Sequence, residues 1–167
     1  MNNIFFIGDT HFGHKNIIKF LREDGTKVRP FDSVKEMDDL IISKWNKTVS
    51  NNDTVYHLGD VVMNRNFLPI LNELNGNKIL ILGNHDKFKM SEYLLYFNKI
   101  YSSHKLYRYI LTHIPIHPFS INNMFNIHGH IHEKRVMLNS EIDPKYICVS
   151  VENINYTPIS IDDIKNI

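Results

Sequence analysis

The stretch that decides the fold is Ile4-Phe5-Phe6-Ile7-Gly8-Asp9-Thr10-His11, in which an apolar run ends in a polar turn. The run has the length and composition of a buried strand, and Gly8 ends it. Asp9 and His11 therefore lie on the loop beyond the carboxyl end of that strand. In open α/β sheets, such loops are the places where ligands bind.

The same order, an apolar β-like run followed by a short polar segment, recurs four times along the chain. The further polar segments are Gly59-Asp60, Gly83-Asn84-His85-Asp86, His113 and Gly129-His130-Ile131-His132. Together with the first segment they supply carboxylate, amide and imidazole groups, about the set that a two-metal site requires. Two adjacent cations suit phosphate-ester hydrolysis, because both the attacking and the leaving oxygen need charge stabilisation.

Between these segments, strand patterns alternate with helix patterns. Strands are predicted at residues 4–7, 54–58, 78–82, 99–102, 106–112, 124–128 and 146–151. Helices are predicted at residues 15–21, 34–45, 68–74 and 91–97, with a short one after Ser160. Ser33 and Glu36 have the spacing of a capping box, which begins the strongest helix. The alternation predicts an α/β fold with helices packed on sheet faces.

Composition limits the class of protein. A chain of 167 residues predicts one domain, 1–167, with a net charge of +1 that gives no broad attraction to nucleic acid or membrane. No apolar run approaches the ~20 residues of a membrane span, and the first residues lack signal-peptide features, so a cytoplasmic location and no membrane partner are expected. Cys148 is the one cysteine, which excludes an internal disulfide and predicts a small buried hydrophobe.

The order and wording of the five polar segments resemble the calcineurin-like metallophosphoesterase superfamily, whose signature reads D-x-H, G-D, G-N-H-D/E, H and G-H-x-H. All five blocks are present in that order between Asp9 and His132. The longer motifs at residues 9–14 and 56–60 resemble those of the small, compact, single-domain branch of this superfamily. The resemblance implies a four-layer α/β/β/α sandwich, with two mixed β-sheets flanked by helices and a dinuclear metal site at the sheet edge.

The resemblance also implies a role for each matched residue. The expected metal ligands are Asp9, His11, Asp60, Asn84, His113, His130 and His132. Of these, Asp9, His11, Asp60 and His132 would hold one cation, and Asp60, Asn84, His113 and His130 the other, so that Asp60 bridges. His85 is the expected catalytic histidine, and Asp86 is expected to hold its ring by hydrogen bonding.

The remaining histidines are less clear from the sequence. His130 and His132 have strand spacing, which predicts that both point to one face. His14 either faces a substrate phosphate or has no role in the site, and Asn84 is a second candidate for substrate contact. His57 and His128 are expected in the core or behind the ligands, while no role is predicted for His104 and His117.

These features predict a metal-dependent phosphoesterase that hydrolyses a small phosphodiester or phosphomonoester, of nucleotide or short nucleic-acid type. A hydroxide that bridges the metals would attack phosphorus, and His85 would assist the leaving group. A donor set without thiolate favours Mn²⁺, with iron, Zn²⁺ and Ni²⁺ as alternatives. The competing interpretation is a catalytically weak protein-binding scaffold of the same fold, although no obligate protein partner is evident. The intact His85 and ligand set favour the enzyme.

Overall fold

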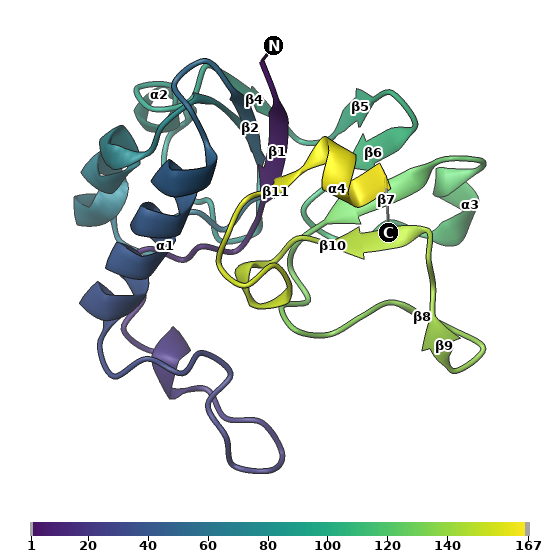
Figure 1. Cartoon of the computed structure of the whole chain (residues 1–167), viewed down its shortest axis with the longest axis horizontal. Coiled ribbons are helices and arrows are strands. Elements are labelled where there is room, and N and C mark those ends of the chain that lie inside the picture. Colours follow the sequence, from purple (N-terminus) through teal and green to yellow (C-terminus); the bar gives the residue numbers. More distant parts are fainter. Residues whose placement is uncertain (1, 166–167) are drawn as a thin grey trace.

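The computed structural model describes residues 2–165, which form two mixed sheets that face each other (Figure 1). The first sheet has the order β11-β1-β2-β3-β4. Its strands β1 (Ile4–Ile7), β2 (Thr54–His57), β3 (Asn77–Ile81) and β4 (Lys99–Tyr101) are parallel, and β11 (Ile159–Ser160) pairs antiparallel with β1.

The second sheet has the order β10-β7-β6-β5. Its members are β10 (Tyr146–Cys148), β7 (Phe125–His128), β6 (Tyr109–Leu111) and the antiparallel edge strand β5 (His104–Leu106). A separate hairpin of β8 (Met137–Leu138) and β9 (Glu141–Ile142) follows β7 and lies away from both sheets in Figure 1. The two sheets thus contain seven parallel strands, and the loops described below follow six of them, namely β1, β2, β3, β6, β7 and β10.

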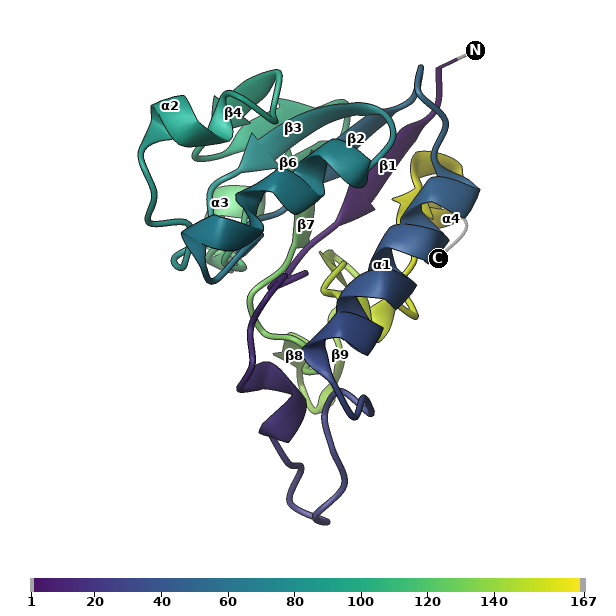
Figure 2. The same cartoon turned by 90° about the vertical axis from the view of Figure 1, so that its left-hand side faces the viewer.

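Two apolar cores hold the layers together. The inter-sheet core includes Phe6, Leu58 and Ile127, together with residues of the terminal helix α4 (Ile161–Lys165). The other core lies between the first sheet and α1 (Val34–Thr48), which covers that face in Figure 2. Trp45 of α1 is fully buried there. Burying side chains of this size stabilises the fold by roughly 1.5–3 kcal/mol each.

The outer face of the second sheet is covered by α3 (Pro118–Ile121) and the loop before it. Asn126 of β7 accepts a hydrogen bond from the Ile116 N–H at 3.0 Å, and the Tyr146 hydroxyl donates to the Ile116 carbonyl at 2.7 Å. This layer is thin because α3 has one turn. The predicted arrangement of two mixed sheets flanked by helices is confirmed.

Several helices differ from the sequence prediction. The segments predicted as helices at 15–21 and 68–74 contain 3-10 helices, η1 (Ile17–Lys19) and η2 (Arg65–Glu73). Pro69 lies inside η2, where its missing N–H and its ring disfavour a regular α-helix. The predicted helix at 91–97 shortens to α2 (Met90–Tyr93). The capped helix after Ser33 is confirmed, since the Ser33 hydroxyl accepts from the Glu36 N–H at 3.1 Å.

Strand boundaries differ in the second half of the chain. The segment predicted as one strand at 106–112 is part of a hairpin, because the chain reverses at Tyr107, whose φ is +52°. The strand predicted at 146–151 ends at Cys148, and η3 (Val151–Asn153) follows. Cys148 is buried, as predicted.

Within residues 2–165, no helix has the length and apolarity needed to cross a membrane. The single domain 1–167 stays a prediction, and its residues 1, 166 and 167 lie outside the described part.

Asp38, on the buried side of α1, gives a first testable prediction. One carboxylate oxygen accepts from the Gly13 N–H at 3.1 Å, and the other has no partner among the described residues. Burial raises the pKa of Asp38 to about 7, from an ordinary value of 3.8. The folded state therefore binds more protons between these values, and the stabilising contribution of the protonated carboxyl is lost as pH rises through this window.

Asp38→Asn keeps the acceptor for Gly13 and removes the titration. We expect the variant to exceed the parent in free energy of unfolding by about 1–3 kcal/mol at pH 8, with the difference shrinking toward pH 4. Urea denaturation at several pH values measures this. Asp39→Asn, at an exposed neighbour on the same helix, is the matched control. A pH-independent difference for Asp38→Asn would contradict the prediction.

Candidate metal centre

The loops that carry the predicted ligands meet at one edge of the two-sheet structure. Parallel pairing aligns the carboxyl ends of β1, β2 and β3, and likewise those of β6, β7 and β10. A parallel bridge between Gly8 and Ser150 joins the two groups of strand ends. Polar residues that are up to 141 positions apart in sequence, such as Asp9 and Ser150, thereby come into hydrogen-bond contact.

One group of donors consists of Asp9, His11 and His132. One carboxylate oxygen or ring nitrogen of each lies within 4.8 Å of the other two. Asp9 is fully buried, and its carboxylate accepts from the His130 N–H at 2.9 Å and from the Ser150 hydroxyl at 2.7 Å. These bonds fix the carboxylate toward the two imidazoles.

A second group is centred on His113. Its Nε2 lies 2.9 Å from Asn84 Oδ1, 3.2 Å from His130 Nδ1 and 3.4 Å from Asp60 Oδ2. Its Nδ1 lies 2.7 Å from the Leu58 carbonyl, a contact that places the proton on Nδ1. With a cation bound, Nε2 would give up its proton, and its lone pair would point toward the other three donors, as a ligating histidine requires.

Asp60 lies between the two groups. Its Oδ2 is 3.7 Å from His11 Nε2 and 3.4 Å from His113 Nε2, while Oδ1 accepts from the His85 N–H at 2.8 Å. Burial raises the pKa of Asp60, but the hydrogen bond and charge of His113 outweigh it and bring the pKa to about 2. An ionised carboxylate between two donor groups suits the predicted bridging role.

The donors fit metal ions on structural grounds. His11 is buried, yet neither of its ring nitrogens has a hydrogen-bond partner among the described residues. Burial lowers the pKa of His11 well below its ordinary value, which leaves the ring neutral with a free lone pair. Burial also raises the pKa of Asp9 to about 6. Burying a carboxylate or an imidazole without a partner costs free energy, and a cation bound between the two groups would offset that cost.

The backbone is strained at the ligand positions. Positive φ angles occur at five of the seven predicted ligands: Asp9, His11, Asp60, His130 and His132. Non-glycine residues rarely adopt this region, and each such residue costs of order 1–3 kcal/mol. The neighbouring glycines leave room for the carboxylates, because a Cβ at Gly83 would clash with Asp60 and a Cβ at Gly129 with Asp9.

The role predicted for Asp86 needs correction. Its carboxylate does not hold the His85 ring; it accepts from the backbone N–H groups of Asp60 at 2.9 Å, Val61 at 3.0 Å and Gly83 at 2.8 Å. Asp86 therefore ties the loop after β3 to the loop after β2. The ring of His85 is half-buried and lies 5.9 Å from the ring of His11, centroid to centroid.

The prediction that His130 and His132 lie on a strand is also wrong. β7 ends at His128, so the two histidines lie on a turn rather than a strand. The positive φ angles direct them to different partners, His130 toward His113 and His132 toward His11. Both still line the same site.

The other histidines surround the centre. The ring of His14, which is half-buried, lies 5.5 Å from that of His11, and Asn84 is exposed. His57 is buried and contacts the Thr10 hydroxyl at 3.0 Å, and His128 is buried with its Nδ1 2.8 Å from the Gly129 carbonyl. The core or supporting positions predicted for His57 and His128 are confirmed.

The sequence did not reveal Glu152 and Arg29. Glu152 Oε1 lies 2.9 Å from His132 Nδ1 and 2.8 Å from Arg29 Nε. Burial raises the pKa of Glu152, but the hydrogen bond of His132 and the charge of Arg29 bring it down to about 2. Arg29, which is fully buried, also donates to the carbonyls of Asp9 at 2.5 Å and Thr10 at 3.0 Å. Ser150 and Glu152 follow an apolar run, the same signal that marked the other segments.

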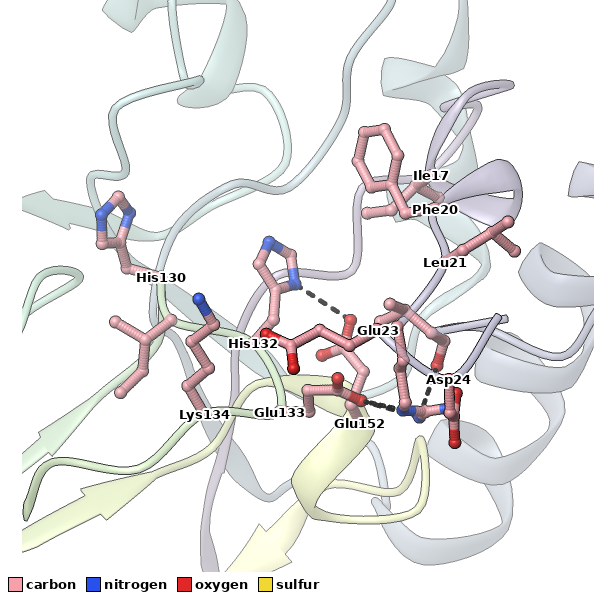
Figure 3. Close-up of a pocket in the computed structure, with 13 residues that line it drawn as sticks. Ile17, Phe20, Leu21, Glu23, Asp24, His130, His132, Glu133, Lys134 and Glu152 are labelled. Atoms are coloured by element: carbon pink, nitrogen blue, oxygen red, sulfur yellow. Dashed lines mark hydrogen bonds and ion pairs between the residues drawn. The ribbon is translucent and has the colours of Figure 1, made fainter. Parts of the chain in front are cut away.

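A cavity of about 780 Å³ opens beside the centre. His130 and His132 line one side, and Figure 3 shows Ile17 of η1 and the following Phe20 and Leu21 together on another. The space is within the range of about 300–1,000 Å³ that small-molecule sites occupy. The centre is therefore open to a ligand from this side.

Comparison with known proteins finds relatives of this chain. The chain is 38% identical over 169 residues to the uncharacterized protein MJ1445 of Methanocaldococcus jannaschii, covering 97% of this chain and 89% of that protein. It is 34% identical over 92 residues to the Gene 66 protein of Mycobacterium phage L5, covering 52% of this chain and 41% of that protein. The crystal structure of AQ665, a protein of unknown function from Aquifex aeolicus, superposes with a TM-score of 0.76 at 32% identity over 99% of both chains. Because the sequence model of the calcineurin-like phosphoesterases matches residues 3–164, the chain belongs to the calcineurin-like phosphoesterase family.

Proposed function

We propose that this chain is a metal-dependent phosphoesterase that hydrolyses a small phosphodiester or phosphomonoester of nucleotide type. The observation that carries the proposal is the meeting of two donor groups around Asp60, with both ring nitrogens of buried His11 lacking a partner in the described chain. If these residues had only a structural role, their buried polar atoms would be hydrogen-bonded to one another.

Two sets of residues would hold two divalent cations. Asp9, His11, Asp60 and His132 form one set, and Asp60, Asn84, His113 and His130 form the other. When bound, such cations supply Lewis acidity, neutralise the charge of the phosphate oxygens and make water acidic enough to react near neutral pH. Oxygen and imidazole donors favour Mn²⁺, with iron, Zn²⁺ and Ni²⁺ as alternatives.

The residues of the chain then position the substrate and move the proton. His85 is the group we assign to donate a proton to the leaving oxygen, because its backbone is fixed on Asp60 while its half-buried ring lies beside that of His11. Asp86 acts through the backbone by holding the β2 and β3 loops together. We assign a contact with the phosphate to His14, whose ring lies beside that of His11, and to the exposed Asn84.

Metal removal tests the proposal. We expect the chain, purified without chelators, to contain bound metal and to hydrolyse bis(4-nitrophenyl) phosphate with added Mn²⁺. Chelation followed by dialysis should lower the rate by about 100-fold or more, and added Mn²⁺ should restore it. Re-addition of Ca²⁺ controls for a non-specific effect of divalent cations. A metal-free chain with full activity would exclude the proposal.

Inactivity of a fully metal-loaded chain on a broad panel of phosphate esters would instead favour the protein-binding scaffold. The cytoplasmic location stays a prediction from the sequence.

A further inference from the structure

We propose that the cavity beside His130 and His132 binds the uncharged, ring-bearing half of a phosphodiester, namely the half that stays on the phosphate after cleavage. The inference rests on the proposed phosphoesterase function and names its substrate class. It makes the chain a phosphodiesterase for nucleotide-sized esters, rather than a phosphomonoesterase or a nuclease that follows a long strand.

The cavity is continuous with the metal centre. His132 of one donor group and His130 of the other line it directly (Figure 3). An aromatic series also joins the two regions, since the ring of Phe20 lies 6.2 Å from that of His14, which lies 5.5 Å from that of His11. A phosphate held at the centre would therefore place one of its ester groups in the cavity.

The wall of the cavity suits an aromatic ring. Phe20 and Leu21 are 52% and 62% exposed, although both are large apolar side chains, and Ile17, Val28 and Ile131 extend the same lining. Exposed apolar side chains at the mouth of a small cavity gain free energy when a ligand ring covers them. Phe20 and Leu21 follow η1 directly, and both line the same cavity as His130 and His132.

Charge in the cavity disfavours a second phosphate. Four acidic side chains line it: Glu23, Asp24, Glu133 and Glu152. Glu133 is paired with Arg22 at 2.7 Å and Glu152 with Arg29 at 2.8 Å, so the charges of Glu23 and Asp24 outweigh that of Lys134, the remaining cation of the lining. Like-charge repulsion would oppose a polynucleotide or a polyphosphate here, whereas a neutral nucleoside or aryl group meets no such cost.

The position of His85 decides which half of the ester enters the cavity. His85 is assigned to the leaving oxygen, and it is not among the described residues that line the cavity. The leaving group therefore departs on the His85 side, and the retained group occupies the cavity. A phosphomonoester has no retained group and would leave the cavity unused.

Three phosphodiesters with the same 4-nitrophenolate leaving group test this inference. They carry methyl, 4-nitrophenyl or 5′-thymidine as the retained group. With Mn²⁺, we expect kcat/KM to be about tenfold or more higher for the two ring-bearing esters than for the methyl ester. Phe20→Ala should remove most of this advantage, chiefly through KM, and should change the methyl ester little.

Tyr107→Ala is the matched control. Tyr107 is 71% exposed and lies on the β5–β6 turn, at the amino end of β6 and so at the opposite end from the site. Equal efficiency for the three esters, or an equal loss on all of them in Phe20→Ala, would overturn the inference while leaving the phosphoesterase function intact. Absence of Mn²⁺-dependent turnover of every ester would instead reject the proposed function.

Binding of the product gives an independent readout. Calorimetric titration of the Mn²⁺-loaded chain with thymidine 5′-monophosphate should give a Kd that rises about fivefold or more in Phe20→Ala and stays unchanged in Tyr107→Ala. Methyl phosphate should bind the parent and Phe20→Ala equally. A Phe20→Ala variant that binds both products as the parent does would contradict the assigned cavity.

Discussion

His85→Ala is expected to lower kcat by about 10²–10⁴-fold while the metal content stays unchanged. The ring of His85 belongs to neither donor group, and its contact with Asp60 is made by the backbone N–H, which alanine keeps. The loss should therefore fall on proton transfer and not on metal binding. Steady-state kinetics on a phosphodiester, together with elemental analysis of the same preparation, measures both quantities.

The leaving group sharpens this test. A proton donor matters most when the departing oxygen is strongly basic, so the loss should be large for an alkoxide and small for 4-nitrophenolate. His104→Ala, which changes a histidine on β5 that belongs to neither donor group, should alter neither rate. Full activity of His85→Ala on every ester would show that another group serves the leaving oxygen.

Asp60→Ala is expected to lose bound metal as well as activity. The Asp60 carboxylate lies between His11 and His113, so both donor groups approach it. Without it, two cations would face each other with less negative charge between them, and their repulsion would rise. We expect the metal content to fall from about two ions per chain to one or fewer, with activity lowered by about 10³-fold or more.

Asp60→Asn removes the negative charge of the side chain but keeps its size. The amide oxygen can still accept from the His85 N–H, which keeps the loop after β3 in place, but the carboxylate charge is gone. This variant should fold as the parent does by circular dichroism and still lose metal. Asp39→Ala, at an exposed position of α1, is the control. Retention of two bound ions by Asp60→Asn would contradict the bridging assignment.

The sequence predicted those parts of the structure that depend on local pattern. The apolar runs at 4–7, 54–58 and 78–82 correspond to parallel strands of the first sheet, and the polar segments after them meet at one edge. The capped helix α1 followed from Ser33 and its periodic apolar face. Convergence of the donors was predictable because parallel strands end at a common edge.

Features that depend on tertiary contact were not predictable. The reversal at Tyr107 has no glycine or asparagine to mark it, so one strand was predicted where a hairpin forms. Asp86 was assigned to its sequence neighbour His85, yet the fold brings three backbone N–H groups from two loops to its oxygens. Arg29 lies in an irregular segment, and only the folded chain shows that it is buried against Glu152.

Because the backbone is left-handed at five of the predicted ligands, their orientation depends on the surrounding fold. A peptide that carries one of these polar segments in isolation would relax to ordinary backbone angles and lose the direction of its donor atoms. Affinity for cations thus resides in the paired strand ends as much as in the ligand side chains. Grafting the five segments onto another scaffold would require the six strand termini and the buried arginine and glutamate behind them.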